Sequence, residues 1–302
     1  MYSKQITLVY LLISYVIGLE LDCLIFFGDS LSDPGNLHNL TLGMYPDNRY
    51  YNGRYSNGPV WAEYILDMIK VKQSENWAYA GATTDNGITA VNGIIPSLHA
   101  QLNWFKLKNR NCYTSKPKKH LVSYIAGGNN YINATISPQV TVDNIKEHLL
   151  ILINELKFTN ILLTDIPPIG ETPSFTAKWL KEGEISGSVH NDPNIKQKVE
   201  THNKLIGELV NTLTAQYPRV NLYFWQFQKF WPSAKSSNPF NSTNWNTELP
   251  CFDDSEDKLG CKHSEDYFFF DTFHPITQIH ELMAGSIFKF LKRSWGGKCP
   301  KS

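Results

Sequence analysis

The sequence predicts an α/β fold in which one parallel sheet is covered by helices on both faces. Short apolar segments bounded by turn residues alternate with longer segments whose apolar residues recur at helical spacing. Strands that are apolar throughout are typical of parallel sheets, because helices cover both sides of such sheets. The chain contains no internal repeat and no low-complexity linker, so we expect residues 21–302 to form one domain.

The N-terminal 20 residues have the pattern of a signal peptide. Lys4 precedes the mostly apolar run Ile6–Gly18, which is short for a membrane span. We therefore expect secretion to the extracellular space, with no stable membrane insertion after cleavage. Three Asn-x-Ser/Thr sequons, at Asn39, Asn133 and Asn241, are candidate glycosylation sites in such a compartment.

The first half of the mature chain begins with a strand that ends at residue 27 and runs into the turn Gly28-Asp29-Ser30. An aperiodic loop rich in Gly, Asn, Pro and Tyr follows, over residues 34–55. The elements expected next are a helix over Val60–Ile69, a strand over Glu75–Ala80 and a helix over Ile94–Leu107.

The second half continues the alternation of strands and helices. The expected strands are His120–Ala126, Asn160–Ile166 and Val220–Phe227. The expected helices are Thr141–Lys157, Asn194–Tyr217 and Ile276–Lys292. We expect an irregular insertion over Ser233–Ser264. The sheet should therefore contain about five strands, with its unusual residues gathered at the carboxyl ends of the first three.

Composition excludes some partners and cofactors. The 28 basic and 28 acidic residues give a formal net charge of zero, so no global field attracts nucleic acid. No spacing of Cys and His suggests a metal site, and we expect no metal and no cofactor. We also expect a monomer.

Five cysteines leave one unpaired if the others form disulfides in an oxidising compartment. Cys251 and Cys261 bracket a short acidic segment and are the first candidate pair. Cys112 with Cys299 is a weaker candidate. Cys23 lies in the first strand, where we expect a small buried apolar residue.

Ser30 lies where a buried strand meets a turn, which is a suitable position for a nucleophile. A serine hydroxyl needs a neighbouring base, and that base needs a third group to orient it. Asp271 and His274 lie three residues apart just before the last helix, which suits these two tasks. The alternative is a turn serine, an N-cap aspartate and a surface histidine.

Ester hydrolysis also needs hydrogen-bond donors for the developing oxyanion. Gly81 and Asn129 follow the second and third expected strands, where a backbone N–H and a side-chain amide would serve. Both residue types also populate ordinary turns.

Several segments resemble the GDSL, or SGNH, hydrolase family. They occur in the family's order and span nearly all of the mature chain: Phe27-Gly-Asp-Ser-Leu-Ser-Asp33, Gly53–Trp61, Asn76–Thr83, Gly127-Gly-Asn-Asn-Tyr131, Ile166–Gly170 and Asp271-Thr-Phe-His274. Two positions depart from the family pattern. Asn130 replaces a common Asp, and Pro34 interrupts helix continuation behind the nucleophile.

The resemblance implies a three-layer, flavodoxin-like α/β/α fold and serine-dependent ester hydrolysis. Ser30 would be the nucleophile, His274 the general base and acid, and Asp271 the orienting group. The backbone N–H groups of Ser30 and Gly81 and the side chain of Asn129 would form the oxyanion hole. Asp29 is then a structural residue that shapes the turn.

The substrate class stays open at this stage. A short acyl group on a carbohydrate and a longer acyl chain on a lipid are both candidates. The sequence has no second long apolar surface helix to serve as an interfacial lid, which favours a soluble or carbohydrate ester. A phosphodiester would normally require metal ligands or a cationic clamp. The alternative to an enzyme is a secreted, non-catalytic carbohydrate- or lipid-binding protein.

Overall fold

The computed structural model describes residues 19–89, 93–108, 112, 119–132, 136–176, 190–238, 240–251 and 262–295. A five-stranded sheet of order β2-β1-β3-β4-β5 lies at its centre, and all its pairings are parallel. The strands are β1 (Glu20–Phe27), β2 (Lys70–Asn76), β3 (His120–Tyr124), β4 (Asn160–Thr164) and β5 (Asn221–Trp225). The predicted α/β fold with a parallel five-stranded sheet is therefore confirmed.

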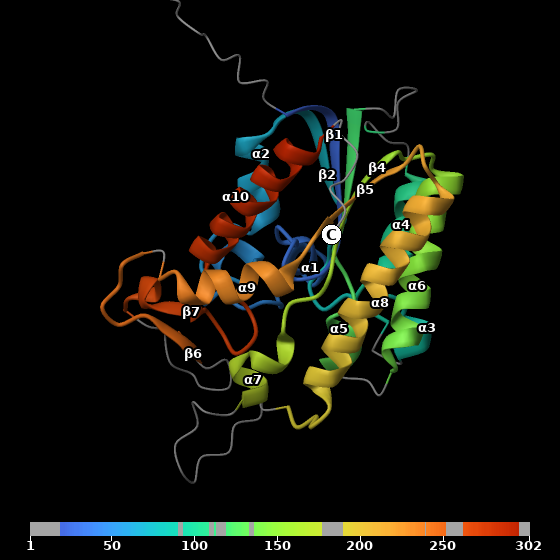
Figure 1. Ribbon diagram of the computed structural model, residues 1–302. Helices are drawn as coiled ribbons and strands as arrows, with labels where there is room; N and C mark the ends of the chain where they lie inside the picture. The colour runs from blue at the N-terminus through green and yellow to red at the C-terminus, as the bar shows by residue number, and fades with distance from the viewer. Residues whose placement is uncertain are drawn as a thin grey trace, which may run out of the picture.

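Helices cover both faces of the sheet, as Figure 1 shows. One layer contains α2 (Trp61–Met68), α9 (Phe227–Ser236) and α10 (Thr277–Ser294). The other contains α4 (Leu98–Leu107), α6 (Pro138–Leu150) and α8 (Ile195–Gln216), and α6 continues as the π-helical turn η3 (Ile151–Glu155). A smaller pair, β6 (Asn246–Pro250) with β7 (Tyr267–Phe269), lies beside α9.

Short helices complete the described fold and lie mostly in connections near the ends of the strands. They are α1 (Asn36–Leu40), η1 (Tyr51–Gly53), α3 (Asn86–Thr89), α5 (Asn129–Ile132), η4 (Ile169–Glu171), α7 (Pro173–Thr176) and η5 (Ser264–Asp266). None of the helices in the described part of the chain has the length and apolar character needed to cross a membrane.

The two cores follow from the alternation of side chains along β1. Leu24 and Phe26 pack into the core beneath α2 and α10, whereas Cys23, Ile25 and Phe27 pack into the core beneath α4, α6 and α8. Successive residues of a strand face opposite sides of a sheet, so a central strand buried on both sides must be apolar throughout.

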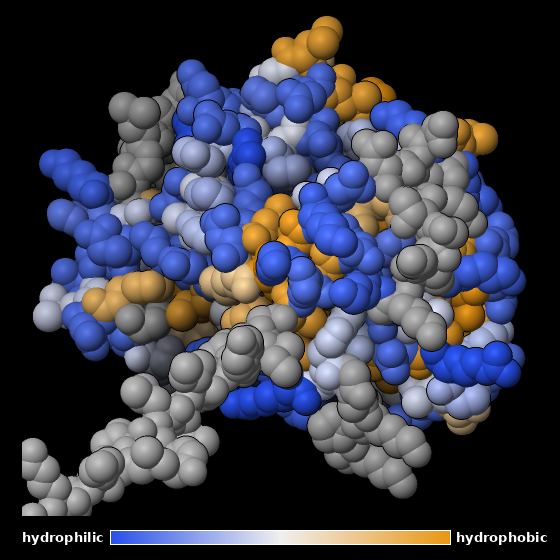
Figure 2. All heavy atoms as spheres, turned by 90° about the horizontal axis from the view of Figure 1, so that it is seen from above, coloured by the Kyte–Doolittle hydropathy of each residue, from blue (hydrophilic) through white to orange (hydrophobic). Residues whose placement is uncertain are grey.

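On the face seen from above in Figure 2, hydrophilic residues cover most of the surface and hydrophobic residues gather near its centre.

Two element predictions need correction. The second strand occupies Lys70–Asn76 rather than Glu75–Ala80. It is an edge strand, and its mostly polar, solvent-accessible residues lack the apolar pattern by which the central strands could be recognised. The segment expected to be an irregular insertion also contains regular structure, namely the end of α9 and strand β6.

The cysteine predictions also need correction. Cys23 forms a disulfide with Cys112, with a Cα–Cα distance of 5.6 Å. Cys23 is therefore not an unpaired apolar residue, and Cys112 does not pair with Cys299. Cys23 and Cys112 both pack in the apolar core. Cys23 is thus buried among apolar residues, as the strand pattern predicts, and it is also disulfide-bonded. Cys251 is disulfide-bonded as well, but Cys261 lies outside the described residues, and that pairing stays a prediction.

Candidate active site

Ser30 lies three residues beyond the end of β1, in a turn closed by local hydrogen bonds. The N–H groups of Ser32 and Asp33 both donate to the Asp29 carbonyl, and the Asp29 carboxylate accepts from the Leu31 N–H. Burial raises the pKa of Asp29 to about 6, although the Leu31 N–H and the nearby His274 oppose this shift. Asp29 thus has the turn-shaping contacts expected of it.

Gln101 of α4 holds the chain just before this turn. Its side-chain carbonyl accepts from the Gly28 N–H at 3.1 Å, and its amide donates to the Gly28 carbonyl at 2.9 Å. A Cβ atom at Gly28 would lie 3.2 Å from the Ile125 carbonyl oxygen, so a glycine allows close approach of the two strand ends.

Three predicted site residues form one chain of hydrogen bonds. His274 Nε2 lies 2.8 Å from Ser30 Oγ, and His274 Nδ1 lies 2.8 Å from Asp271 Oδ2. Asp271 and His274 belong to a tight turn between β7 and α10, in which Asp271 Oδ1 accepts the N–H groups of Phe273 and His274. One turn therefore positions the carboxylate and the imidazole, and a distant strand end supplies the hydroxyl.

Asp271 is buried and has a further partner. The Tyr50 hydroxyl donates to Asp271 Oδ2 at 2.8 Å. Burial acts to raise the pKa of Asp271, but attraction to His274 and hydrogen bonds from His274 and Phe273 outweigh it, so the pKa is lowered. The carboxylate is therefore ionised at neutral pH.

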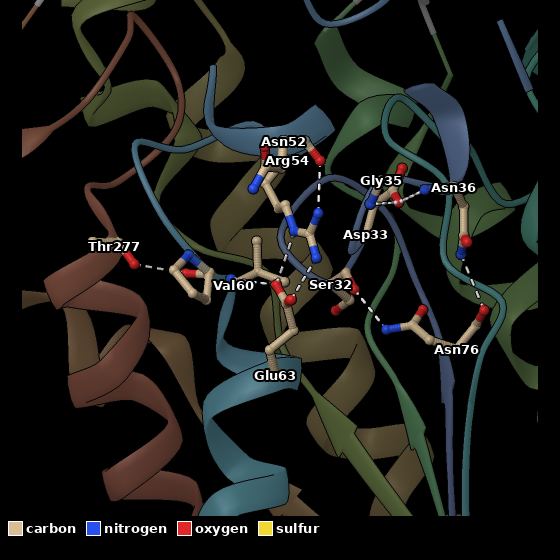
Figure 3. Close-up of polar contacts among 11 residues, drawn as sticks. Ser32, Asp33, Gly35, Asn36, Asn52, Arg54, Val60, Glu63, Asn76 and Thr277 are labelled. Carbon is tan, nitrogen blue, oxygen red and sulfur yellow. Dashed lines mark hydrogen bonds and ion pairs between the residues drawn. The ribbon is translucent and has the colours of Figure 1, made fainter. Parts of the chain in front are cut away.

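The loop before α2 supports the His274 turn. The Tyr55 ring packs on the His274 ring at a centroid distance of 4.9 Å. Asn57 Oδ1 accepts from the Thr277 N–H at 2.8 Å, and Ser56 Oγ donates to the Pro275 carbonyl at 3.0 Å. Figure 3 shows the neighbouring contacts of this loop, where Arg54 pairs with Glu63 at 2.6 Å.

Asp33 joins the turn after Ser30 to the loop that carries Gly81. One carboxylate oxygen accepts from the N–H groups of Gly35 and Asn36 (Figure 3), and the other accepts from the Ala80 N–H at 2.8 Å. Ala80 directly precedes Gly81, which has a φ of 78° and thus a conformation that favours glycine. Helix α1 begins only at Asn36, as expected from the interruption at Pro34.

Asn129 and Asn130 join the loop after β3 to the same Gly81 loop. The Asn129 amide donates one hydrogen bond to the Ala82 carbonyl at 3.0 Å. Asn130 is fully buried: its Oδ1 accepts from the Thr84 N–H at 3.0 Å, and its Nδ2 donates to Thr84 Oγ1 at 2.8 Å and to Thr141 Oγ1 at 3.2 Å. The amide in place of the common Asp therefore uses both its donor and its acceptor.

A cavity of about 210 Å³ opens at these loops. Four of the predicted site residues line it: Ser30, Gly81, Asn129 and His274. The fifth, Asp271, contacts His274, so the structure brings all five together. The rest of the cavity wall is largely apolar and includes Leu37, Ile95, Ile132, Ile166, Ile169 and Trp231. Such a lining suits a hydrocarbon group better than a polar one.

Other predicted sites are placed as follows. Asn39 and Asn241 are exposed, whereas Asn133 lies outside the described residues. Within the described ranges, no group of three or more His, Cys, Asp or Glu side chains could hold a metal ion.

The sequence analysis did not identify Tyr50 or Gln101 as site residues. Tyr50 lies in an aperiodic loop and Gln101 in an ordinary helix, so no motif marks either residue.

Comparisons with known proteins give consistent matches. A model described as "GDSL-like Lipase/Acylhydrolase" matches residues 24–287. The chain is 26% identical over 282 residues to a thermolabile hemolysin of Vibrio parahaemolyticus, with 88% of this chain and 62% of the relative covered. It is also 26% identical over 181 residues to a phosphatidylcholine-sterol acyltransferase of Aeromonas hydrophila, with 56% and 51% covered. The chain thus spans less than two thirds of the length of these relatives.

One solved structure supports the fold. A family two carbohydrate esterase from Clostridium thermocellum superposes with a TM-score of 0.50 at 13% identity, covering 92% of this chain and 65% of that one. At this identity the likeness concerns the arrangement of strands and helices.

Proposed function

The chain belongs to the GDSL-like lipase/acylhydrolase family, and we propose that it is a secreted, serine-dependent hydrolase of carboxylic esters. The observation that carries this proposal is the chain of hydrogen bonds from Asp271 through His274 to Ser30. A serine hydroxyl becomes nucleophilic when a base oriented by a third group can take its proton.

In the first half of the proposed reaction, Ser30 Oγ attacks the ester carbonyl carbon while its proton moves to His274 Nε2. Asp271, whose lowered pKa keeps it ionised, stabilises the resulting imidazolium. The carbonyl oxygen becomes an oxyanion and accepts hydrogen bonds from the Ser30 and Gly81 N–H groups and from the Asn129 amide. That amide has a second hydrogen available, because it uses one on the Ala82 carbonyl.

In the second half, the tetrahedral intermediate collapses and the alcohol leaves with the proton from His274. A water molecule then attacks the acyl group on Ser30, with His274 as the general base. The carboxylic acid is released, and the Ser30 hydroxyl regains its proton. One ester and one water are thereby converted to one alcohol and one acid.

The acyl part of the ester would occupy the apolar cavity beside Ser30. The alcohol part is not assigned by these contacts, so small-acyl, carbohydrate and lipid esters all remain candidates. The names of the relatives point both ways, since one is a phosphatidylcholine-sterol acyltransferase and one structural neighbour is a carbohydrate esterase.

The cellular setting is part of the proposal. We infer a signal peptide over residues 1–20, one hydrolase domain over 21–302 and a monomeric state; Asn39, Asn133 and Asn241 stay candidate glycosylation sites. The Cys23–Cys112 disulfide supports export, because disulfides persist in oxidising compartments.

A series of p-nitrophenyl esters from acetate upward tests the function. The wild type should hydrolyse members of the series, and Ser30→Ala should lose at least ~10³-fold in kcat/KM. Ser236→Ala, an exposed serine on α9, is the matched control and should behave like the wild type. Full activity of Ser30→Ala would refute the mechanism, and inactivity of the wild type on every ester would favour the non-catalytic binding protein.

A further inference from the structure

A short exposed segment beside the cavity carries an unusual concentration of apolar side chains. We call Leu40, Leu42, Met44 and Tyr45 the apolar tip; their exposed fractions are 43%, 92%, 66% and 60%. Ten large hydrophobic side chains are exposed in the described part of the chain, and five of them lie within residues 40–51. Single exposed hydrophobics need no explanation, but a group of them usually marks a surface that binds something.

Local hydrogen bonds give the apolar tip a defined shape. Thr41 Oγ1 donates to the Leu37 carbonyl at 2.9 Å and accepts from the Tyr45 N–H at 3.1 Å. The His38 carbonyl accepts from the Gly43 N–H at 2.8 Å, and the His38 ring nitrogen lies 3.1 Å from the Pro46 carbonyl. The backbone of the tip is thus paired internally, while its large side chains point to solvent.

The apolar tip adjoins the wall of the cavity. Leu37, in the same short helix as Leu40, lines the cavity, and so does Tyr55, which follows the tip along the chain. On a second loop, Ile95 lines the cavity while its neighbour Ile94 is 71% exposed. The segment that carries the tip and the loop that carries Ile94 therefore each contribute an apolar residue to the cavity wall and expose others on the outside of the protein.

The absence of charged residues from the tip favours a lipid surface over an acidic or basic protein as its partner. Residues 38–46 contain no Asp, Glu, Lys or Arg, and the next charged residues, Asp47 and Arg49, pair with each other at 2.6 Å. The tip thus offers no charge for recognising an acidic or basic protein. A lipid surface would accept the aliphatic side chains in its acyl region and keep the Tyr45 hydroxyl at the polar boundary.

We propose that the apolar tip inserts into the surface of a lipid aggregate and brings the cavity to esters presented there. The part of this inference that concerns ester substrates rests on the proposed function. It favours lipid esters over soluble or carbohydrate esters, in contrast to the preference drawn from the sequence.

Vesicle flotation tests insertion without any turnover. Ser30→Ala protein is floated with phosphatidylcholine vesicles, alone and combined with Leu42→Ser and Met44→Ser. Removing two apolar side chains should weaken vesicle binding at least about tenfold. Leu107→Ser, which changes a leucine that is 83% exposed at the end of α4, is the matched control and should retain binding. Leu42→Trp should strengthen binding, because tryptophan favours the membrane boundary.

Kinetics with one ester in two physical states supply the second test. The rate on tributyrin above its solubility limit, divided by the rate below it, should fall at least about tenfold in Leu42→Ser/Met44→Ser and stay unchanged in Leu107→Ser. Equal vesicle binding by the double variant, or an unchanged ratio, would overturn the inference. A smaller oligomer of the double variant with normal vesicle binding would instead make the tip a protein contact and also overturn it. Absence of any hydrolysis by the wild type would refute the proposed function, while flotation would still decide on the tip.

Discussion

The Tyr50 hydroxyl donates a 2.8 Å hydrogen bond to Asp271 Oδ2, the same oxygen that lies 2.8 Å from His274 Nδ1. Tyr50 is 8% exposed and comes from a loop more than 200 residues away in sequence. The hydroxyl therefore gives the carboxylate a contact from outside its own turn. We regard Tyr50 as a positioning residue, because it acts on the proposed reaction through Asp271.

Tyr50→Phe should lower kcat several-fold and leave KM nearly unchanged, because the carboxylate loses a restraint rather than substrate contacts. The free energy of unfolding should fall by about 1–2 kcal/mol. Tyr124→Phe is the matched control: it removes a buried hydroxyl that bonds His148 in the core, so it should lower stability without lowering kcat. Equal kcat values for Tyr50→Phe and wild type would assign Tyr50 a purely structural role.

Asp271→Asn should lower kcat by roughly 10³- to 10⁴-fold, because an amide neither stabilises the imidazolium nor fixes the same tautomer. Circular dichroism and thermal unfolding should still indicate a folded protein, since an asparagine oxygen can accept the Phe273 and His274 N–H groups. A collapse of thermal stability would mean that Asp271 acts chiefly as a cap for the turn.

Asn130→Leu should lower both stability and kcat. Leucine leaves the buried Thr84 N–H without its acceptor, at a cost of about 1–3 kcal/mol, and it loosens the loop that carries Gly81. Asn130→Asp should retain more activity than Asn130→Leu, because a carboxylate can accept from both Thr84 groups and from Thr141. Asn160→Leu, at the start of β4, is the control: its amide is also buried and hydrogen-bonded, but its loss should reduce stability only. Parallel losses of kcat in both leucine variants would refute a positioning role.

Asp165 should make stability depend on pH. Burial raises its pKa from 3.8 to about 7, although the N–H groups of Phe227 and Gln228 oppose the shift. Between these pH values the native state holds a proton that the unfolded state lacks, so this group's contribution to stability falls as pH rises, by at most about 1.4 kcal/mol per pH unit. Above pH 7 and below pH 4 the contribution is constant.

The measurement for Asp165 compares wild type with Asp165→Asn by urea unfolding at pH 5 and pH 8. The variant should gain stability relative to wild type on going to pH 8, because asparagine removes the buried charge. A difference that is the same at both pH values would contradict the raised pKa.

The sequence predicted the central strands well because parallel strands buried on both faces are mostly apolar, as in Cys23–Phe27 of β1 and in Leu121 and Val122 of the fully buried β3. It misplaced β2, whose residues are mostly polar because this edge strand has one neighbour and little burial. A pattern of hydrophobic residues carries little information about such a strand.

The sequence predicted that Ser30, Asp271 and His274 would lie close together, and they do, since Ser30 follows a strand and Asp271 and His274 share one turn. Tyr50 could not be predicted, because its contact with Asp271 depends on how a long aperiodic loop folds. The Cys23–Cys112 disulfide was missed for a similar reason: the two residues are 89 positions apart, and burial of Cys23 explains an apolar residue equally well.

In the proposed reaction, Ser30 forms a covalent acyl intermediate. A fluorophosphonate reagent mimics the first step, and mass spectrometry of the digested protein locates the adduct. We predict one adduct on the peptide that contains Ser30, its absence in Ser30→Ala, and slower labelling in Asp271→Asn. Ester hydrolysis at the wild-type rate by Ser30→Ala, or an adduct on a different residue, would show that Ser30 is not the nucleophile.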